Sequence, residues 1–229
     1  MHEKLPSING LRALSVAMVI IEHLGYTGLF SGVYRYQYVR AGMDFARDGR
    51  LGVSMFFILS SFLITRLLLA EEEVQSAINL RNFYMRRLLR IVPAYYFLLL
   101  VYYLAQRLGY LHIETNSWFT ALTFTKNLHW PEDWYTAHSW SLSVEEQFYL
   151  IWPLLFRWGD KPRRYMCAIL LAAVPLLRLY NYYVPTGMLN DLTLCMNLDA
   201  LALGCLLAFY CKQLLAAWRP EVWRVLAIG

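Results

Sequence analysis

The chain has 229 residues, of which 59% are hydrophobic and only 16% are charged, and its formal net charge is +5. Because roughly a quarter of the residues in a soluble domain are charged, this chain has too little polar surface to cover a globule in water, and its composition predicts a polytopic membrane protein. Its Trp and Tyr content is typical of aromatic belts at membrane interfaces, and it lacks the basic run with interleaved aromatic residues of a nucleic-acid-binding protein, so no nucleic-acid partner is expected.

Hydropathy predicts an all-α bundle of membrane-spanning helices that forms a single domain over residues 1–229. A spanning helix needs about 20 mostly apolar residues. No small-residue cleavage pattern follows the first apolar stretch, which is therefore expected to be a retained helix. Six stretches qualify and a seventh begins in "EVWRVLAIG"; the six are 10–30, 51–70, 91–109, 139–157, 165–183 and 192–211.

The distribution of Lys and Arg over the predicted loops sets the expected orientation. About two thirds of them fall on the side of the N-terminus, and positive charge gathers on the cytoplasmic side of membrane proteins. The N-terminus is therefore predicted to be cytoplasmic, although the four arginines between Arg35 and Arg50 oppose this assignment.

The first predicted helix carries Arg12 and His23 in "NGLRALSVAMVIIEHLGY". At 100° per residue, positions eleven apart project from one face, separated by about 16 Å along the axis. A neutral imidazole is a plausible general base near neutral pH; the alternative is a histidine that hydrogen-bonds between helices for packing. Glu22 points about 100° away from His23, and could orient a neighbouring helix or be an interfacial carboxylate.

Arginines gather in "RNFYMRRLLRIVP", just before the third predicted spanning stretch. Arg86 and Arg90 are four residues apart and Arg87 and Arg90 are three apart, so their side chains can converge. Arginine forks suit phosphate groups, but a basic helix that holds anionic lipid headgroups has the same spacing. From spacing alone, the lipid interpretation is favoured.

A polar stripe runs through "HSWSLSVEEQFYLIWP" and contains Glu145, Tyr149 and Trp152. A polar stripe on a spanning helix needs a polar neighbour or a cavity. Glu145 is expected near the outer end, at a depth comparable with that of His23, so the two could meet; Glu146 is expected to face elsewhere. The alternative is an interfacial carboxylate beside a Trp and Tyr belt.

Four further features have structural interpretations. Asp199 is expected in a salt bridge with an arginine or in a catalytic role, and Gly204 would allow close helix approach. Ser60 and Ser61 are expected to bond neighbouring carbonyl groups. The four cysteines lie in apolar segments without a CxxC pair, so neither disulfides nor a metal site are expected.

Five stretches together resemble the acyltransferase-three family of integral-membrane acyltransferases, which modify surface polysaccharides. They occur in the family's order over residues 8–208. Asn9 and Ser61 depart from the family pattern, which usually has Asp and Gly there. The stretches are "INGLRALSVAMVIIEH", "GRLGVSMFFILSSFLI", "FYMRRLLRIVPAYY", "HSWSLSVEEQFYLIWP" and "LDALALGCLLA".

The resemblance implies roles for particular residues. The family's Arg-x10-His pattern falls on Arg12 and His23, its Arg-x-x-Arg pattern on Arg87 and Arg90, and its glutamate on Glu145. Members of the family have more spanning helices than this chain supplies, so the resemblance also implies a domain that is incomplete at its C-terminus.

The predicted function is transfer of an acyl group, expected to be acetyl, from acyl-CoA to a hydroxyl of a cell-surface or lipid-linked carbohydrate such as exopolysaccharide or lipopolysaccharide. His23 is the expected general base, and Glu145 or Glu22 would orient its imidazole or stabilise its charge. The expected co-substrate site consists of the arginines Arg12, Arg86, Arg87 and Arg90.

Two other functions fit the same residues. In a proton-coupled transporter or lipid-linked-sugar flippase, Arg12, His23 and Glu145 would form a proton relay; the third possibility is an inactive scaffold in a polysaccharide-assembly complex.

The expected location is the bacterial cytoplasmic membrane, as a multi-pass protein. The expected partners are acyl-CoA, the carbohydrate acceptor and membrane lipids, with a homo-oligomer or a polysaccharide-assembly complex as the possible assemblies.

Overall fold

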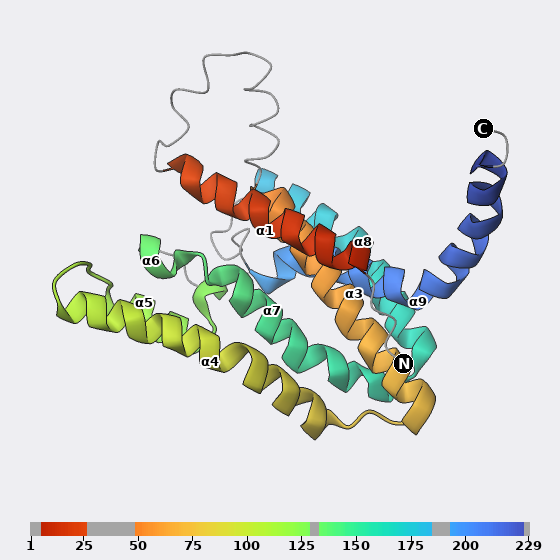
Figure 1. Ribbon diagram of the computed structural model, residues 1–229, viewed down its shortest axis with the longest axis horizontal. Helices are drawn as coiled ribbons and strands as arrows, with labels where there is room; N and C mark the ends of the chain where they lie inside the picture. The colour runs from red at the N-terminus through yellow and green to blue at the C-terminus, as the bar shows by residue number, and fades with distance from the viewer. Residues whose placement is uncertain (1–5, 27–48, 129–132, 185–192, 227–229) are drawn as a thin grey trace, which may run out of the picture. The chain divides into compact units, whose positions relative to one another are not determined.

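The computed structural model describes residues 6–26, 49–128, 133–184 and 193–226, and every regular element within these ranges is helical (Figure 1). The predicted all-α class is confirmed for this part of the chain. In chain order the elements are α1 (Pro6–Tyr26), α3 (Gly49–Gln75), α4 (Leu80–Arg107), α5 (Thr115–Leu122), the 3₁₀ turn η2 (Lys126–Leu128), α6 (Trp134–Ala137), α7 (Trp140–Ile151), the 3₁₀ helix η3 (Trp152–Trp158), α8 (Asp160–Tyr183) and α9 (Leu194–Leu226).

Five helices among the described residues are long and apolar enough to cross a membrane, so five of the six predicted spans are confirmed by length and composition. They lie in α1, α3, α4, α8 and α9. The stretch 139–157 does not form one long α-helix. The 12-residue α7 ends at Ile151 and a 3₁₀ helix follows. Pro153 explains the change, because proline lacks the N–H that an α-helical ladder needs.

The predicted start of a seventh helix is not confirmed as a separate element, because α9 continues as one 33-residue helix to Leu226. The described chain divides into two compact units. Unit 1 contains α1, the first part of α3 up to Arg66, and α9 from Ala200 onward, and unit 2 contains residues 67–199.

Small residues allow the helices of unit 1 to approach closely. A Cβ atom on Gly52 of α3 would lie 2.9 Å from the carbonyl oxygen of Ser15 in α1. A Cβ atom on Gly204 of α9 would lie 2.1 Å from Ser61 Oγ and 2.2 Å from the carbonyl oxygen of Ile58 in α3. Glycine at these crossings brings two backbones together, as is common between membrane helices, and the expected role of Gly204 is confirmed.

The two serines of α3 differ. Ser61 Oγ donates to the carbonyl oxygen of Phe57 at 2.8 Å, as expected for a serine in an apolar helix. Ser60 Oγ is buried and has no hydrogen-bond partner among the described residues, so the same prediction is wrong for Ser60.

In unit 2, α4 and α7 lie side by side in opposite directions. Tyr84 near the start of α4 donates its hydroxyl to the carbonyl oxygen of Leu150 near the end of α7, at 2.8 Å, while Tyr95 in the middle of α4 contacts Ser139, which precedes α7. The 12 residues of α7 therefore accompany only the first half of the 28-residue α4.

Two ion pairs hold the remaining helices of unit 2. The buried Arg163 of α8 pairs with Glu72 at the end of α3 through Nη2 and Oε2 at 3.2 Å, and its guanidinium lies 4.1 Å from the Phe156 ring centre. Arg178 of α8 binds both carboxylate oxygens of Asp199 in α9, at 2.7 and 2.8 Å. The predicted salt bridge of Asp199 is confirmed.

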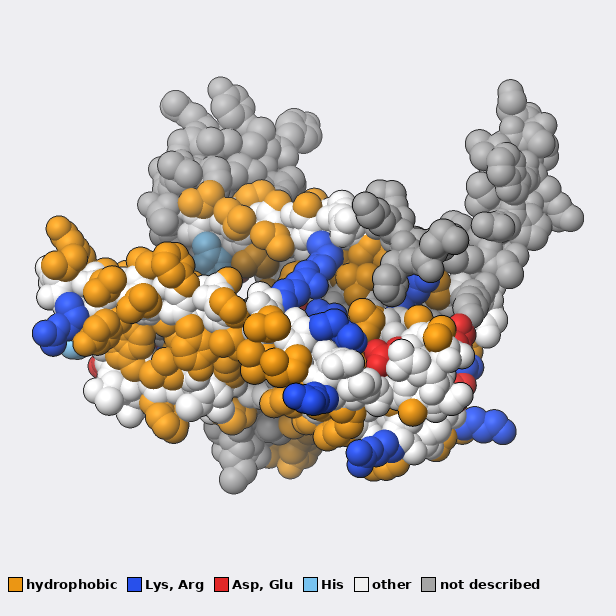
Figure 2. Space-filling model, turned by 60° about the horizontal axis from the view of Figure 1, so that its bottom comes forward, with side chains coloured by type: hydrophobic (Ala, Val, Ile, Leu, Met, Phe, Trp, Pro, Cys, Tyr) orange, Lys and Arg blue, Asp and Glu red, His pale blue; other side chains and the backbone are white. Residues whose placement is uncertain are grey.

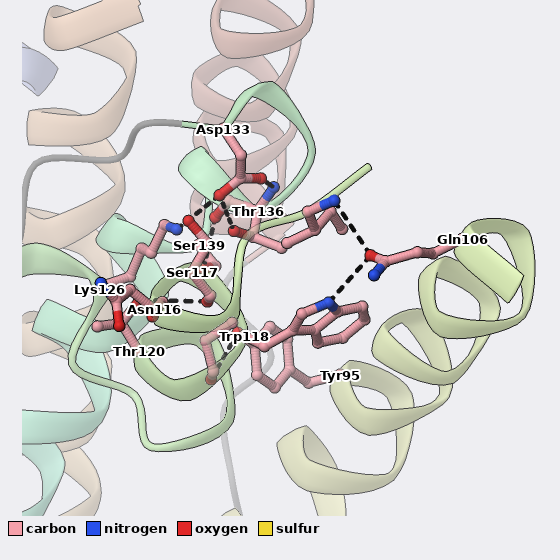
Figure 3. A network of polar contacts seen from close by, with 12 residues as sticks. Tyr95, Gln106, Asn116, Ser117, Trp118, Thr120, Lys126, Asp133, Thr136 and Ser139 are labelled. Atoms are coloured by element: carbon pink, nitrogen blue, oxygen red, sulfur yellow. Dashed lines mark hydrogen bonds and ion pairs between the residues drawn. The ribbon is translucent and has the colours of Figure 1, made fainter. Parts of the chain in front are cut away.

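A polar network organises the segment between α4 and α7, described over residues 108–128 and 133–139 and called here the α4–α7 segment (Figure 3). Lys126 Nζ donates to Asp133 Oδ2 at 2.7 Å, and both side chains are buried. Asp133 also accepts from the backbone N–H of Thr136 at the start of α6. Burial alone would raise the pKa of Asp133, but hydrogen bonds from Lys126, Thr136 and Ser117 outweigh it and lower the pKa from 3.8 to about 2.

Gly204→Ala is expected to destabilise unit 1, because the new methyl group would overlap the Ile58 carbonyl oxygen and force α3 and α9 apart. Such overpacking costs roughly 1–3 kcal/mol. The matched control is Gly10→Ala in α1, where a Cβ atom meets nothing within 4 Å and alanine should be neutral or slightly stabilising. The midpoint of thermal unfolding in detergent measures both, and equal midpoints for the two variants would contradict the close crossing.

Asp133→Asn is expected to flatten the acid dependence of stability. The folded-state pKa of about 2 lies below the ordinary value of 3.8, so the stabilisation by this carboxylate is complete above about pH 4 and is lost as the pH falls towards 2. The variant should be less stable at pH 7, because Lys126 stays buried without its anion. Unfolding midpoints measured from pH 7 to pH 2 test this, and parallel curves for the two proteins would refute it.

Candidate functional site

The predicted face of α1 is present as a continuous stripe. Arg12 and His23 are both half-buried, whereas the leucines beside them, Leu11 and Leu24, are exposed. Because α1 is one unbroken helix from Pro6 to Tyr26, the two polar groups lie about 16 Å apart along its axis. The helix thus has an apolar outer face and a partly buried face with one cation and one imidazole.

The His23 imidazole is oriented by its own helix. Its Nδ1 atom lies 2.7 Å from the carbonyl oxygen of Val19. A carbonyl oxygen can only accept, so Nδ1 carries the hydrogen, and in the neutral ring the lone pair is on Nε2. A backbone group therefore holds the tautomer that a base acting through Nε2 needs.

Arg12 and Glu22 contact α3 on either side of this arrangement. The Arg12 guanidinium lies 5.6 Å from the centre of the Phe56 ring, a cation–π distance. The Glu22 carboxylate lies against Gly49, where an added Cβ atom would be only 1.5 Å from Glu22 Oε2. Glycine at position 49 thus leaves the space that the carboxylate occupies, while the Nδ1 position of His23 is taken by Val19.

In unit 2 the arginine motif and the "WSLSVEEQFY" motif come together. Arg87 of α4 points at α7, where its guanidinium lies 5.5 Å from the centre of the Tyr149 ring and interacts electrostatically with Glu145 and Glu146. Tyr149 donates its hydroxyl to Glu145 Oε1, and Glu145 is buried, with 6% of its surface exposed. Glu146 Oε1 is also buried and has no hydrogen-bond partner among the described residues. Arg87, Glu145, Glu146 and Tyr149 are called here the carboxyl cluster.

This arrangement differs from the sequence-based interpretation in two respects. Glu145 lies level with the arginines of α4, not near the opposite end of that helix, and Glu146 faces Arg87 together with Glu145 instead of pointing elsewhere. The antiparallel pairing of α4 with α7 causes both differences, and helical periodicity alone does not reveal a partner helix. The predicted meeting of Glu145 with His23 would join the two units and stays a prediction.

The three neighbouring arginines of α4 have three different environments. Arg87 enters the carboxyl cluster, whereas Arg86 pairs with Glu71 of α3 at 3.2 Å and has 54% of its side chain exposed. Arg90 is exposed and makes no hydrogen bond or ion pair with the described residues. The three arginines therefore do not converge through shared protein contacts. Of the three, only Arg90 has no hydrogen bond or ion pair with the described residues.

Sequence reasoning missed two sets of buried charges. Arg163 lies in the predicted loop between the spans 139–157 and 165–183, where no role was assigned to it, yet it is 2% exposed and binds Glu72. Lys126 and Asp133 lie in the connection between the predicted spans 91–109 and 139–157, and no role was assigned to them either, yet Lys126 is fully buried. Pairing over 91 residues leaves no local pattern, whereas the seven-residue spacing of Lys126 and Asp133 was a usable signal once that connection was taken to fold.

These features define a class: a helical membrane protein with an oriented imidazole on one helix and a buried arginine–carboxyl cluster on two others. The family model described as "Acyltransferase domain" matches residues 5–229, and the chain belongs to this family. The resemblance to the acyltransferase-three family is thus confirmed. No solved structure matches the chain.

Known relatives carry related names. The chain is 31% identical over 201 residues to the peptidoglycan O-acetyltransferase OatA of Listeria monocytogenes, a match that covers 77% of this chain and 29% of that protein. It is 30% identical over 172 residues to YrhL of Bacillus subtilis, a candidate peptidoglycan O-acetyltransferase. This match covers 67% of this chain and 24% of the relative. The chain thus spans less than a third of the length of these relatives.

Arg87→Met is expected to destabilise unit 2 much more than Arg86→Met. Removal of Arg87 leaves two neighbouring carboxyl groups without their cation, at a cost of about 3 kcal/mol, whereas the half-exposed pair of Arg86 with Glu71 contributes roughly 0–1 kcal/mol. Adding Glu146→Gln to Arg87→Met should restore part of the loss, because it removes one negative charge. Thermal unfolding in detergent gives all three values, and equal effects of the two methionine variants would contradict the assigned environments.

Proposed function

We propose that the chain is an O-acetyltransferase domain that moves an acetyl group from acetyl-CoA to a hydroxyl of a carbohydrate. The observation that carries the proposal is His23, whose Nδ1–H is held by the Val19 carbonyl at 2.7 Å, in a member of an acyltransferase family. In this tautomer the lone pair of the neutral ring is on Nε2, which makes Nε2 the basic atom; activation of a hydroxyl requires such a base.

The reaction uses His23 as general base. Nε2 accepts the proton of the acceptor hydroxyl while the oxygen attacks the thioester carbonyl carbon. The carbon–sulfur bond then breaks, and the thiolate of coenzyme A leaves and takes up a proton. The Val19 carbonyl occupies the orienting position at Nδ1, so the proposed role of Glu22 is to stabilise the imidazolium through charge; a contribution of Glu145 stays a prediction.

The proposed donor site uses the arginines of α4 and α1. Arg90 is the foremost candidate for a coenzyme A phosphate, because it is exposed and has no hydrogen bond or ion pair with the described residues. Arg87 lies one turn earlier, and Arg86 would have to leave Glu71 to take part. Arg12, at the start of α1, is the proposed contact of unit 1 with the donor. Acyl-CoA is cytoplasmic, so a donor site formed by these arginines requires that the N-terminus be cytoplasmic. The proposed location is the bacterial cytoplasmic membrane.

The acceptor is proposed to be a cell-surface glycan, and peptidoglycan is the first to test because two relatives carry it in their names. Glycan hydroxyls are weak nucleophiles near neutral pH, so a base such as His23 is needed. A homo-oligomer or a polysaccharide-assembly complex is the proposed assembly. The reaction requires no metal ion.

His23→Gln is expected to lower transfer by a factor of about 10²–10⁴, the usual contribution of a general base, without loss of donor binding. The control is His112→Gln, which changes an exposed histidine of the α4–α7 segment. Release of free thiol from acetyl-CoA in the presence of peptidoglycan fragments measures transfer, and equilibrium binding of labelled coenzyme A measures the donor site. Near-normal thiol release by His23→Gln would disprove the base assignment, and no thiol release by the unsubstituted protein would favour the transporter.

A further inference from the structure

Helix α5 runs back along the second half of α4. The backbone N–H of Ile113, just before α5, and the Trp118 Nε1 within it both donate to Gln106 Oε1 at 3.1 Å, whereas the carbonyl oxygen of Leu122, at the far end of α5, accepts from the Tyr96 hydroxyl at 2.7 Å. Gln106 and Tyr96 are ten residues apart on α4, which is about 15 Å. The chain therefore turns at the end of α4 and returns over that distance beside the same helix (Figure 1).

The part of α4 that α5 accompanies is the apolar part. The window from Leu80 to Arg107 qualifies as a membrane span. Four of its arginines, Arg81, Arg86, Arg87 and Arg90, lie in its first eleven residues, and the fifth is its last residue. The residues from Ile91 to Ala105 contain no charged side chain. If α4 crosses the hydrocarbon, Tyr96 and the end of α5 beside it lie well inside the bilayer.

The outward side of α5 matches this depth. Phe119 is 65% exposed and Leu122 is 44% exposed, and on α4 the neighbouring Phe97 and Leu100 are 66% and 51% exposed. Hydrophobic side chains cover the α4–α5 side of unit 2 (Figure 2). These two helices thus present one apolar surface, whose natural partner at that depth is lipid hydrocarbon.

The inward side of the segment carries buried polar groups that find partners there. Lys126 pairs with Asp133, and Asn127 exchanges two hydrogen bonds with Gln147 of α7, at 3.0 and 2.8 Å. Gln147 also donates to the carbonyl oxygen of Phe124 at 3.0 Å. Non-helical backbone and charged groups are tolerated at membrane depth only where the protein satisfies them in this way.

We propose that the α4–α7 segment re-enters the membrane beside the second half of α4, with the exposed face of α5 in contact with lipid hydrocarbon. Hydropathy assigned one complete membrane crossing to residues 139–157. In this proposal the α4–α7 segment makes the outer half of that crossing, and α7 makes only the inner half. This inference does not depend on the proposed acyl transfer.

The test is the depth of a bimane fluorophore on single cysteines in vesicles that contain phosphatidylcholines brominated at defined acyl positions. Cys195 and Cys211, which are exposed and half-buried, are first replaced by Ser, while the buried Cys167 and Cys205 stay. Leu122→Cys reports the end of α5. The two reference positions on α4 are Phe97→Cys, beside that end, and Leu108→Cys, at the C-cap of α4 and 72% exposed.

The label at position 122 should be quenched by the same bromine position as the label at 97, about 16 Å deeper than the label at 108. It should also be protected from aqueous iodide. A label at 122 that matches 108 and is quenched by iodide would overturn the proposal. Phe119→Cys, one turn earlier on α5, provides a second measurement if Leu122→Cys does not fold. Its label should lie between the two references, and a depth equal to that of 108 would count equally against re-entry.

Discussion

The constraint on which this structure depends is that a polar group inside a hydrocarbon layer must find its partner within the protein, because no water is present to supply one. Within the described residues, three charged pairs follow it. Arg178 binds both oxygens of Asp199, Arg163 binds Glu72 and packs on an aromatic ring, and Lys126 binds Asp133. Each pair joins groups from different elements, so satisfying the charge also fixes how those elements pack. Removing one member leaves the other without compensation, which costs far more than a pair at the surface.

The same constraint makes His23 and the carboxyl cluster notable. The imidazole needs one defined hydrogen bond to hold its tautomer, and the helix supplies it four residues earlier through Val19. In the cluster, by contrast, two adjacent carboxyl groups face a single arginine, and one buried oxygen of Glu146 has no hydrogen-bond partner among the described residues. Two like charges so close disfavour a fully ionised pair. Incomplete compensation of this kind is stabilised by the surrounding packing and is more typical of functional sites than of purely structural ones.

Much of this fold was predictable because hydropathy and helical periodicity report the environment of one helix at a time. They predicted the five spans, the shared face of Arg12 and His23 and the close approach at Gly204. They did not reveal partners. Arg87 meets Glu145 because α4 and α7 pair across a folded segment. Arg163 meets Glu72 through a contact between residues 91 positions apart. The wrong prediction of one spanning helix over 139–157 has the same origin. An apolar stretch of the right length does not show that its helical type changes at Pro153. Nor does it show that two different elements accompany α4.

The arginines of α4 show how neighbouring residues of one type acquire separate roles. At 100° per residue, successive positions 86 and 87 face different surroundings: one reaches Glu71 on α3 and stabilises the turn between the two helices, and the other reaches the carboxyl cluster on α7. Arg90 lies one turn after Arg86 and Arg87, and is exposed without a protein partner in the described residues. A guanidinium already bound by a carboxylate must break that pair before it can bind a phosphate, whereas an unpaired one loses only water. The competition between protein carboxylates and an incoming anion, and not the number of arginines in the motif, would therefore determine which of these cations holds the proposed donor.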